Sequence, residues 1–229
     1  MTRLAFALLA LTFCVRGASA QVSPVSDALC QSMRAHRVMS ASPAVPCARL
    51  ALVRFTYVDF GGHTHDDGRV VVLDAVADEV FAIFRELQAR RFPIASARLM
   101  DAFGGDDDAS MAANNTSSYN DRAVAGTSSV SVHAYGCAID LNPVQNPYVT
   151  KNEIAPPAGA AFVKRRPVQP GMAEAVIGIF ARHGFPVWGG GWRRETDYQH
   201  FQVDRALAVR LVATSSEEAK RLFTASLRR

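Results

Sequence analysis

The chain has 229 residues, of which 49% are hydrophobic and 20% are charged, and its formal net charge is +4. This is the composition of a globular protein with one sizeable core or two small ones. The charge is mild, and the sequence has neither a run of Lys and Arg nor the interleaved aromatic and basic residues of a single-strand groove. These features argue against a nucleic-acid partner.

The first 20 residues are typical of a secretory signal peptide. Arg3 precedes an apolar run from Leu4 to Val15, and Ala18-Ser19-Ala20 offers a cleavage site. The run is shorter than the about 20 apolar residues that span a bilayer, and no second run of that length follows. We therefore expect an exported protein, periplasmic or extracellular, with no membrane span in the mature chain. A buried N-terminal helix is the alternative.

Three cysteines follow the predicted cleavage site, namely Cys30, Cys47 and Cys137. An odd number leaves one of them unpaired in an oxidising compartment. Cys30 and Cys47 flank a polar segment, and a bridge between them would close a short loop. Two free thiols are the alternative.

The N-terminal part of the mature chain predicts an arm followed by a hairpin. Residues 21–48 are polar and rich in Ala, Ser and Pro, which favours an irregular arm leading into one domain over residues 49–229. Branched and aromatic residues predict a strand over 49–60, and a second strand over 69–73. The turn sequence GGHTHDDG between them favours a hairpin. His63 and His65 in this turn are exposed or line a cleft rim, with a second metal site as the alternative.

The next segment predicts a helix, a strand and a long polar loop. Apolar residues at helical spacing predict a helix over about 74–91, with Asp74 as its cap. Residues 94–100 read as a strand. Residues 101–129 are polar and rich in Gly, and a loop of that length is usually functional or disordered. Its acidic run at 106–108 favours a solvated loop, with calcium binding as the alternative.

The last third of the chain alternates helices and strands. Residues 171–184 predict a helix that Gly184 ends. Residues 185–203 predict a strand, a glycine turn and a second strand, in which Trp188 and Trp192 either fill the core or form a substrate wall. Residues 204–229 predict helices, with a new start near Ser215. The mixed order indicates an α+β fold, a small antiparallel sheet flanked by helices.

Two short motifs place polar side chains on one face of a sheet. In CAIDLN, strand alternation puts Asp140 on one face with Ala138 and Asn142, and the apolar Cys137, Ile139 and Leu141 on the other. In HFQV, the same rule puts His200 and Gln202 on one face. Two such strands would present Asp140 and His200 side by side. His133 precedes Asp140 in a loop that Gly136 allows to fold back tightly.

Two histidines and a carboxylate form a three-ligand zinc set. A catalytic zinc keeps three protein ligands and leaves its fourth position to water. The bound ion lowers the pKa of that water and polarises a carbonyl group. Asp197, three residues before His200, lies close enough to act as a base without binding the metal. A packed strand with two ordinary polar residues is the alternative.

Both motifs resemble those of the zinc peptidases of bacterial cell walls. SVHAYGCAID fits the pattern S-x-H-x-x-G-x-A-x-D, and DYQH fits its acidic-x-x-His second half. The similarity extends from about residue 55 to 203. The family comprises D-alanyl-D-alanine carboxypeptidases, dipeptidases and L-alanyl-D-glutamate endopeptidases (the LAS metallopeptidases). The resemblance implies the hedgehog/DD-peptidase fold and one Zn²⁺ per chain.

The resemblance also implies roles for individual residues. The metal ligands would be His133, Asp140 and His200. Asp197 would be the general base, and two residues would bind substrate, Arg122 in YNDR and Ser131. A surface ion pair is the alternative for Arg122, and a surface turn for Asp197.

The implied function is hydrolysis of an amide bond in the peptide stems of peptidoglycan. The carboxypeptidase branch commonly has Glu-Pro-Trp-His in the second motif, whereas this chain has Asp-Tyr-Gln-His. NTSSYNDR, AIDLNP and NPYV are also closer to the endopeptidase type. We therefore expect an L-alanyl-D-glutamate endopeptidase. D-alanyl-D-alanine carboxypeptidase activity and a non-catalytic, zinc-stabilised wall-binding or signalling module are the alternatives.

Overall fold

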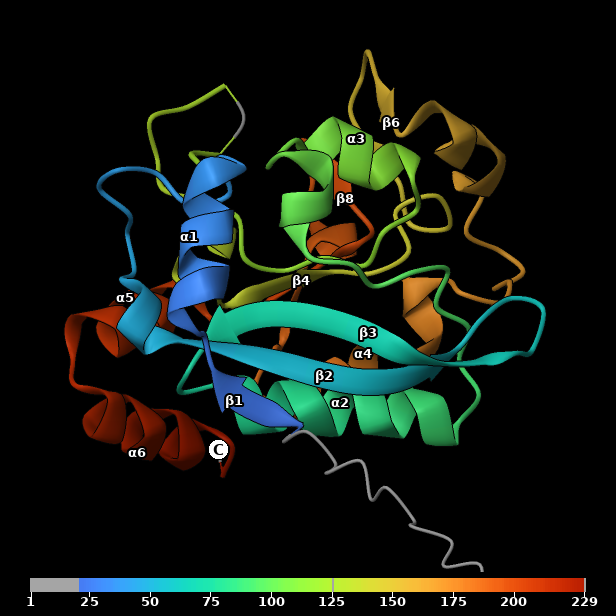
Figure 1. The fold of residues 1–229 in the computed structure, drawn as a ribbon. Helices are drawn as coiled ribbons and strands as arrows, with labels where there is room; N and C mark the ends of the chain where they lie inside the picture. Colours follow the sequence, from blue (N-terminus) through green and yellow to red (C-terminus); the bar gives the residue numbers. More distant parts are fainter. Residues whose placement is uncertain (1–20, 125, 229) are drawn as a thin grey trace, which may run out of the picture.

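The computed structural model describes residues 21–124 and 126–228. The predicted signal peptide, residues 1–20, lies outside them. The described residues form an α+β structure with three small sheets, each of three antiparallel strands, flanked by helices (Figure 1). The predicted α+β class is confirmed.

The first sheet has the order β1-β2-β3, with β1 at Val22–Pro24, β2 at Leu50–Val58 and β3 at Thr64–Leu73. The predicted hairpin is confirmed, although β3 begins five residues earlier than the sequence indicates because Thr64 and His65 pair with the end of β2. Gly68 faces Phe55, whose ring would lie 2.6 Å from any Cβ at that position. The missing side chain therefore leaves room for an aromatic residue of the core.

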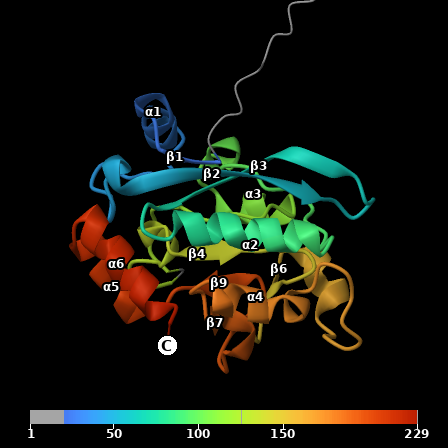
Figure 2. The ribbon, with the colours of Figure 1, turned by 90° about the horizontal axis from the view of Figure 1, so that it is seen from below.

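The helix α2 (Ala77–Ala89) lies between the first sheet and α4 (Ile177–Arg182), as Figure 2 shows. Its buried face includes Phe84, whose ring stacks on Phe55 with 3.6 Å between centroids. The predicted cap is wrong: α2 begins three residues after Asp74 and has no side-chain cap. Asp74 instead accepts hydrogen bonds from Arg49 at 2.9 and 3.2 Å, a long-range ion pair that local sequence does not reveal.

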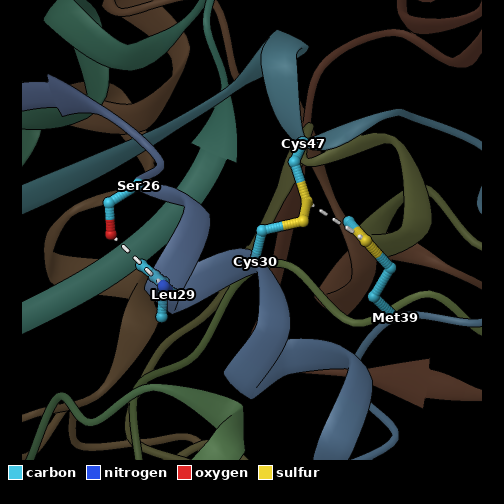
Figure 3. The surroundings of a disulfide bond; sticks show 5 residues. All are labelled: Ser26, Leu29, Cys30, Met39 and Cys47. Atoms are coloured by element: carbon cyan, nitrogen blue, oxygen red, sulfur yellow. Dashed lines mark hydrogen bonds between the residues drawn. A yellow bond between two sulfur atoms is a disulfide. The ribbon is translucent and has the colours of Figure 1, made fainter.

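The segment 21–48 is ordered, so the prediction of an irregular arm is wrong. It contains β1, which pairs with β2, and α1 (Asp27–Ala35), which lies on the opposite side of the first sheet from α2 (Figure 2). Ser26 caps α1 by accepting the N–H of Leu29, and a disulfide joins Cys30 to Cys47 (Figure 3). The disulfide that the sequence left open is thus present, while Cys137 is free and buried.

The end of this arm is attached to the segment that carries Arg122. Both carboxylate oxygens of Asp121 accept backbone N–H groups of the arm, from Ser40 at 3.0 Å and from Ala44 at 3.3 Å. The N–H of Asp121 donates to the carbonyl of Val38 at 2.9 Å. The arm and residue 121 therefore form one hydrogen-bonded unit.

Residues 94–129 differ from the prediction in two ways. Residues 94–100 form no strand, and within them the Asn115 side chain binds the backbone of Arg98. It accepts the N–H of Arg98 at 2.7 Å and donates to the same residue's carbonyl at 3.0 Å. The predicted long loop contains a 3₁₀ turn, Met100–Phe103, and the helix α3, Asp107–Ala112, which Asp106 caps. The acidic run at 106–108 is therefore the start of a helix and not a solvated loop.

The other two sheets lie in the second half of the chain. One has the order β4-β9-β7 and the other β6-β5-β8. Their strands are short: β4 Ala138–Asp140, β5 Tyr148–Val149, β6 Ile154–Ala155, β7 Val187–Trp188, β8 Thr196–Asp197 and β9 His200–Gln202. The strand, turn and strand predicted over 185–203 are confirmed, with β8 as an added strand.

The C-terminal helices are α5 (Arg205–Ala213) and α6 (Ser216–Ser226), and Ser215 caps α6 as expected. The helix predicted over 171–184 is shorter, since only α4 is α-helical. Gly184 follows it with a φ of +83° and closely approaches the ring of Phe223. Among the described residues, no helix is long and apolar enough to cross a membrane.

Candidate metal centre

The pairing of β4 with β9 brings two of the predicted ligands together. In this antiparallel register Asp140 lies directly opposite His200, and Ile139 lies opposite Phe201. Residues opposite one another point to the same face. The apolar pair enters the core, where both side chains are fully buried. The polar pair points to the other face, as strand alternation predicts, and His200 Nδ1 lies 3.1 Å from Asp140 Oδ1.

His133 reaches the same point from a short 3₁₀ turn, His133–Tyr135. Gly136 ends this turn with a φ of +64°, and a Cβ there would lie 2.5 Å from the backbone nitrogen of Leu73. Only glycine suits that position, because the left-handed conformation and the close approach both exclude a side chain. The turn places His133 Nε2 3.2 Å from Asp140 Oδ2 and 3.2 Å from His200 Nδ1.

Each imidazole is held by a hydrogen bond from its outer nitrogen. His133 Nδ1 lies 2.6 Å from the carbonyl oxygen of Ser118, and His200 Nε2 lies 2.9 Å from Oε1 of Gln202. Both partners are acceptors, so each ring carries a proton on that side and turns its other nitrogen toward Asp140. Such outer hydrogen bonds are a regular feature of metal-binding histidines.

These residues fit a zinc ion. One donor atom from each of His133, Asp140 and His200 lies within 4.8 Å of the other two. Two neutral imidazole nitrogens and one carboxylate are the donor set of a catalytic zinc site. Burial alone would raise the pKa of Asp140, but the two histidines outweigh it and hold that pKa well below its usual range. The carboxylate is therefore ionised, as a metal ligand must be.

The three side chains lie at a cleft of about 590 Å³. Asp197, Arg122 and Ser131 also line it, so the structure brings all six predicted site residues to one cavity. Asp197 belongs to β8, opposite Tyr148 of β5. Burial raises the pKa of Asp197 to about 6, and the charge of Asp140 acts in the same direction. Oδ1 of Asp197 is buried and receives no hydrogen bond from the described residues.

Arg122 lies in the cleft and also makes an ion pair. Its Nε contacts Oδ2 of Asp107 at the start of α3, and Asn120 donates to the other oxygen of Asp107 at 2.8 Å. The guanidinium is thus oriented from one side, and one Nη contacts the carbonyl of Ala123 at 3.3 Å. Ser131 is buried, and its hydroxyl accepts the N–H of His133 at 3.2 Å. Arg122 therefore makes an ion pair, as the alternative to a substrate-binding role predicts, and it also lines the cleft.

The two tryptophans differ in position: one packs against the core and the other lines the cleft, the two possibilities that the sequence left open. Trp188 is half-buried against the core, and its indole donates to the carbonyl of Tyr198 at 2.8 Å. Trp192 is 38% exposed and lines the cleft, with its ring centroid 5.4 Å from that of His200. Trp192 is the tryptophan that a ligand in the cleft can reach.

Sequence reasoning assigned no role to Gln202 and Asp107. Alternation already placed Gln202 on the face of His200, so the signal was present. Asp107 gave none, since its pairing with Arg122 depends on α3. The other histidine pair is elsewhere: His65 Nε2 and His63 Nδ1 lie 2.8 and 3.3 Å from Oδ2 of Asp59, at the hairpin turn.

Comparison with known families matches residues 125–203 to a family described as D-alanyl-D-alanine carboxypeptidase. The match contains both motifs and the three candidate ligands, and it confirms the resemblance for this part of the chain. The family is one of zinc peptidases that act on peptidoglycan. No curated protein and no solved structure gives a significant match.

Proposed function

We propose that this chain is an exported, zinc-dependent peptidase that hydrolyses an amide bond in the peptide stems of peptidoglycan. The observation that supports this best is the convergence of His133, Asp140 and His200 at a cleft that Asp197 also lines. The family match over residues 125–203 supports the same reaction class.

The three converging side chains would hold the zinc through His133 Nε2, His200 Nδ1 and a carboxylate oxygen of Asp140. When bound, the ion would supply a Lewis acid and lower the pKa of a coordinated water from 15.7 to about 7. Ser118 and Gln202 fix the direction of the two rings. A scissile carbonyl placed in the cleft would then meet a metal site whose ligands are already oriented, which lowers the cost of reorganisation.

Asp197 would act as the general base and acid. A pKa of about 6 leaves its carboxylate mostly ionised at neutral pH, yet basic enough to take a proton. The same side chain would then deliver this proton to the leaving amine. Arg122 would pair with a substrate carboxylate through its Nη groups, since a guanidinium fork matches that group. Ser131 would offer a hydroxyl to the bound peptide.

The role of Asp197 can be tested with the Asp197→Ala variant. We expect zinc content to stay at one ion per chain, while hydrolysis of stem peptides falls about 10²- to 10⁴-fold, the usual contribution of a general base. Asp108→Ala is the matched control, because Asp108 lines the same cleft but is exposed. Full activity of the Asp197→Ala variant would refute the assigned role.

The bond that we propose is an internal one of the stem peptide, as in L-alanyl-D-glutamate endopeptidases. Asp-Tyr-Gln-His in the second motif departs from the Glu-Pro-Trp-His of the carboxypeptidase branch and supports this choice. Defined stem peptides and whole sacculi, digested and then analysed by mass, separate the two activities. Release of D-alanine alone would indicate a carboxypeptidase and contradict the endopeptidase proposal.

A non-catalytic module would bind the metal without hydrolysing peptides. Asp197 argues against it, since its buried carboxylate with a raised pKa is of no use to a purely structural site. Stoichiometric zinc together with no cleavage of any stem peptide would favour this alternative.

A further inference from the structure

Arg205 is a second arginine in the cleft, and the metal site does not use it. It is the first residue of α5 and follows the ligand His200 closely in the chain. Its side chain lines the same cleft as the three candidate metal ligands, and the residue is exposed. A ligand that enters the cleft can therefore reach its guanidinium group.

One hydrogen bond fixes where this guanidinium lies. Nη2 of Arg205 donates to the carbonyl oxygen of Val130 at 2.7 Å. The next residue, Ser131, donates its backbone N–H to the carbonyl oxygen of Arg122 at 3.0 Å. Arg205 and Arg122 thus contact neighbouring residues of one segment, and both line the cleft. The two arginines belong to the same part of its wall.

The two arginines differ in their ionic partners. Nε of Arg122 forms an ion pair with Asp107, which balances part of its charge. Within residues 21–124 and 126–228, no carboxylate forms an ion pair with Arg205, whose guanidinium donates only to a neutral carbonyl group. A guanidinium carries further N–H donors in a planar fork that matches a carboxylate. The charge and the remaining donors of Arg205 are therefore open to a ligand.

The other charged residues of the cleft lie elsewhere in its wall. Glu153 directly precedes β6 and Glu195 directly precedes β8, and both line the cleft. Figure 2 shows α5 and β6 on opposite sides of β9. The cleft is therefore positive toward α5 and negative toward β6. A carboxylate of a bound peptide is attracted to the first side and repelled by the second.

We propose that Arg205 is a specificity-determining residue that binds the free carboxylate of the D-glutamyl residue in the stem peptide. This inference rests on the proposed peptidase function and adds a contact to it. A glutamyl residue uses one carboxyl group in the peptide chain and keeps the other free. In an L-alanyl-D-glutamate bond this residue adjoins the scissile amide, which suits a side chain that follows His200 closely. Arg122 stays available for another carboxylate of the peptide.

The test compares stem peptides with a free glutamyl carboxylate and the same peptides with this carboxylate amidated. For the wild-type zinc enzyme, amidation should raise KM about tenfold, the effect of losing one charge-assisted hydrogen bond in a partly solvated site. For Arg205→Gln, the free peptide should already show this raised KM, and amidation should add nothing. Added salt should raise the wild-type KM for the free peptide more than for the amidated one.

Three variants separate substrate binding from a structural role. Arg205→Lys keeps the charge and should retain a higher KM for the amidated peptide. Arg210→Gln makes the same change at an exposed arginine of α5 that does not line the cleft, and it should alter neither KM. Arg122→Gln should weaken binding of both peptides and keep the ratio of their KM values.

This ratio is the measurement that a structural role would not change. If Arg205 only supported Val130, Arg205→Gln would raise KM for both peptides alike, and the effect of amidation would persist. Zinc content and the thermal midpoint of Arg205→Gln show whether the metal site and the fold are retained.

The outcomes distinguish this inference from the function on which it rests. If the wild-type enzyme cleaves stem peptides and amidation has the same effect in Arg205→Gln, the inference is wrong and the peptidase proposal stands. Equal wild-type KM values for the two peptides also overturn it. If the wild-type enzyme cleaves neither peptide, the proposed function fails first, and the carboxylate contact fails with it.

Discussion

Removing the acceptor of Gln202 should weaken zinc binding without altering any ligand. In the Gln202→Leu variant, His200 Nε2 loses the oxygen that now lies 2.9 Å away, while His133, Asp140 and His200 all remain. Gln202 is 9% exposed and His200 is 7% exposed, so the leucine is accommodated in a buried setting. The change therefore isolates the outer hydrogen bond of one ligand.

The expected magnitude follows from the position of the ring proton. With Gln202 in place, the neutral ring of His200 carries its proton on Nε2 and offers Nδ1 to the metal. Without it, the proton is better placed on Nδ1, which lies 3.1 Å from Oδ1 of Asp140. Zinc must then displace that proton or move it to an unsatisfied Nε2. Loss of such outer contacts typically lowers metal affinity about 10- to 100-fold, which corresponds to about 1.4 to 2.8 kcal/mol.

Competition with a chromophoric zinc chelator at fixed pH measures this affinity directly. Gln202→Glu is the matched control, since its carboxylate still accepts from Nε2 and should keep the affinity at or above that of the wild type. Thermal midpoints of the metal-free variants show whether the fold is retained. A Gln202→Leu affinity within about twofold of the wild type, with the fold intact, would refute the reasoning about ring orientation.

Two further predictions concern pH and the disulfide. In the metal-free protein, burial alone would lower the pKa of His200, but the hydrogen bond and charge of Asp140 prevail and raise it to about 8. Below that pH, zinc binding must therefore expel a proton from His200. Competition with a chelator should show that the zinc affinity falls about tenfold for each pH unit from about pH 8 downward. A zinc affinity that stays constant over that interval would contradict this. Replacing both Cys30 and Cys47 by serine removes a crosslink of sequence separation 17. The free energy of unfolding, measured by urea titration, should fall by about 3 kcal/mol. A decrease below about 1 kcal/mol would show that the disulfide is not needed to stabilise the arm.

The candidate site was more predictable from the sequence than its surroundings, for a physical reason. Alternation in two short strands fixes which side chains share a face, so the sequence alone places Asp140 and His200 on matching faces. Their alignment opposite one another depends only on the register of β4 and β9. Gly136 marked the tight turn that returns His133 to the same point.

The failures arose where long-range contacts replace local ones. Asp74 has the sequence context of a helix cap, but its carboxylate forms an ion pair with Arg49 instead. Residues 94–100 have the composition of a strand, but the side chain of Asn115 binds the backbone of Arg98 within them. A local sequence pattern cannot show which side chain from a distant part of the chain will form such a contact.

The arm has a consequence for where the protein can assume its final form. A bond between two cysteine sulfurs persists where thiols are oxidised and is rare in the cytosol. The crosslink from Cys30 to Cys47 encloses Ser40 and Ala44, whose N–H groups hold the side chain next to Arg122. Before that crosslink forms, these two groups are tethered only by weaker contacts. The proposed peptide-binding end of the cleft would thus reach full rigidity only after the chain has left a reducing environment.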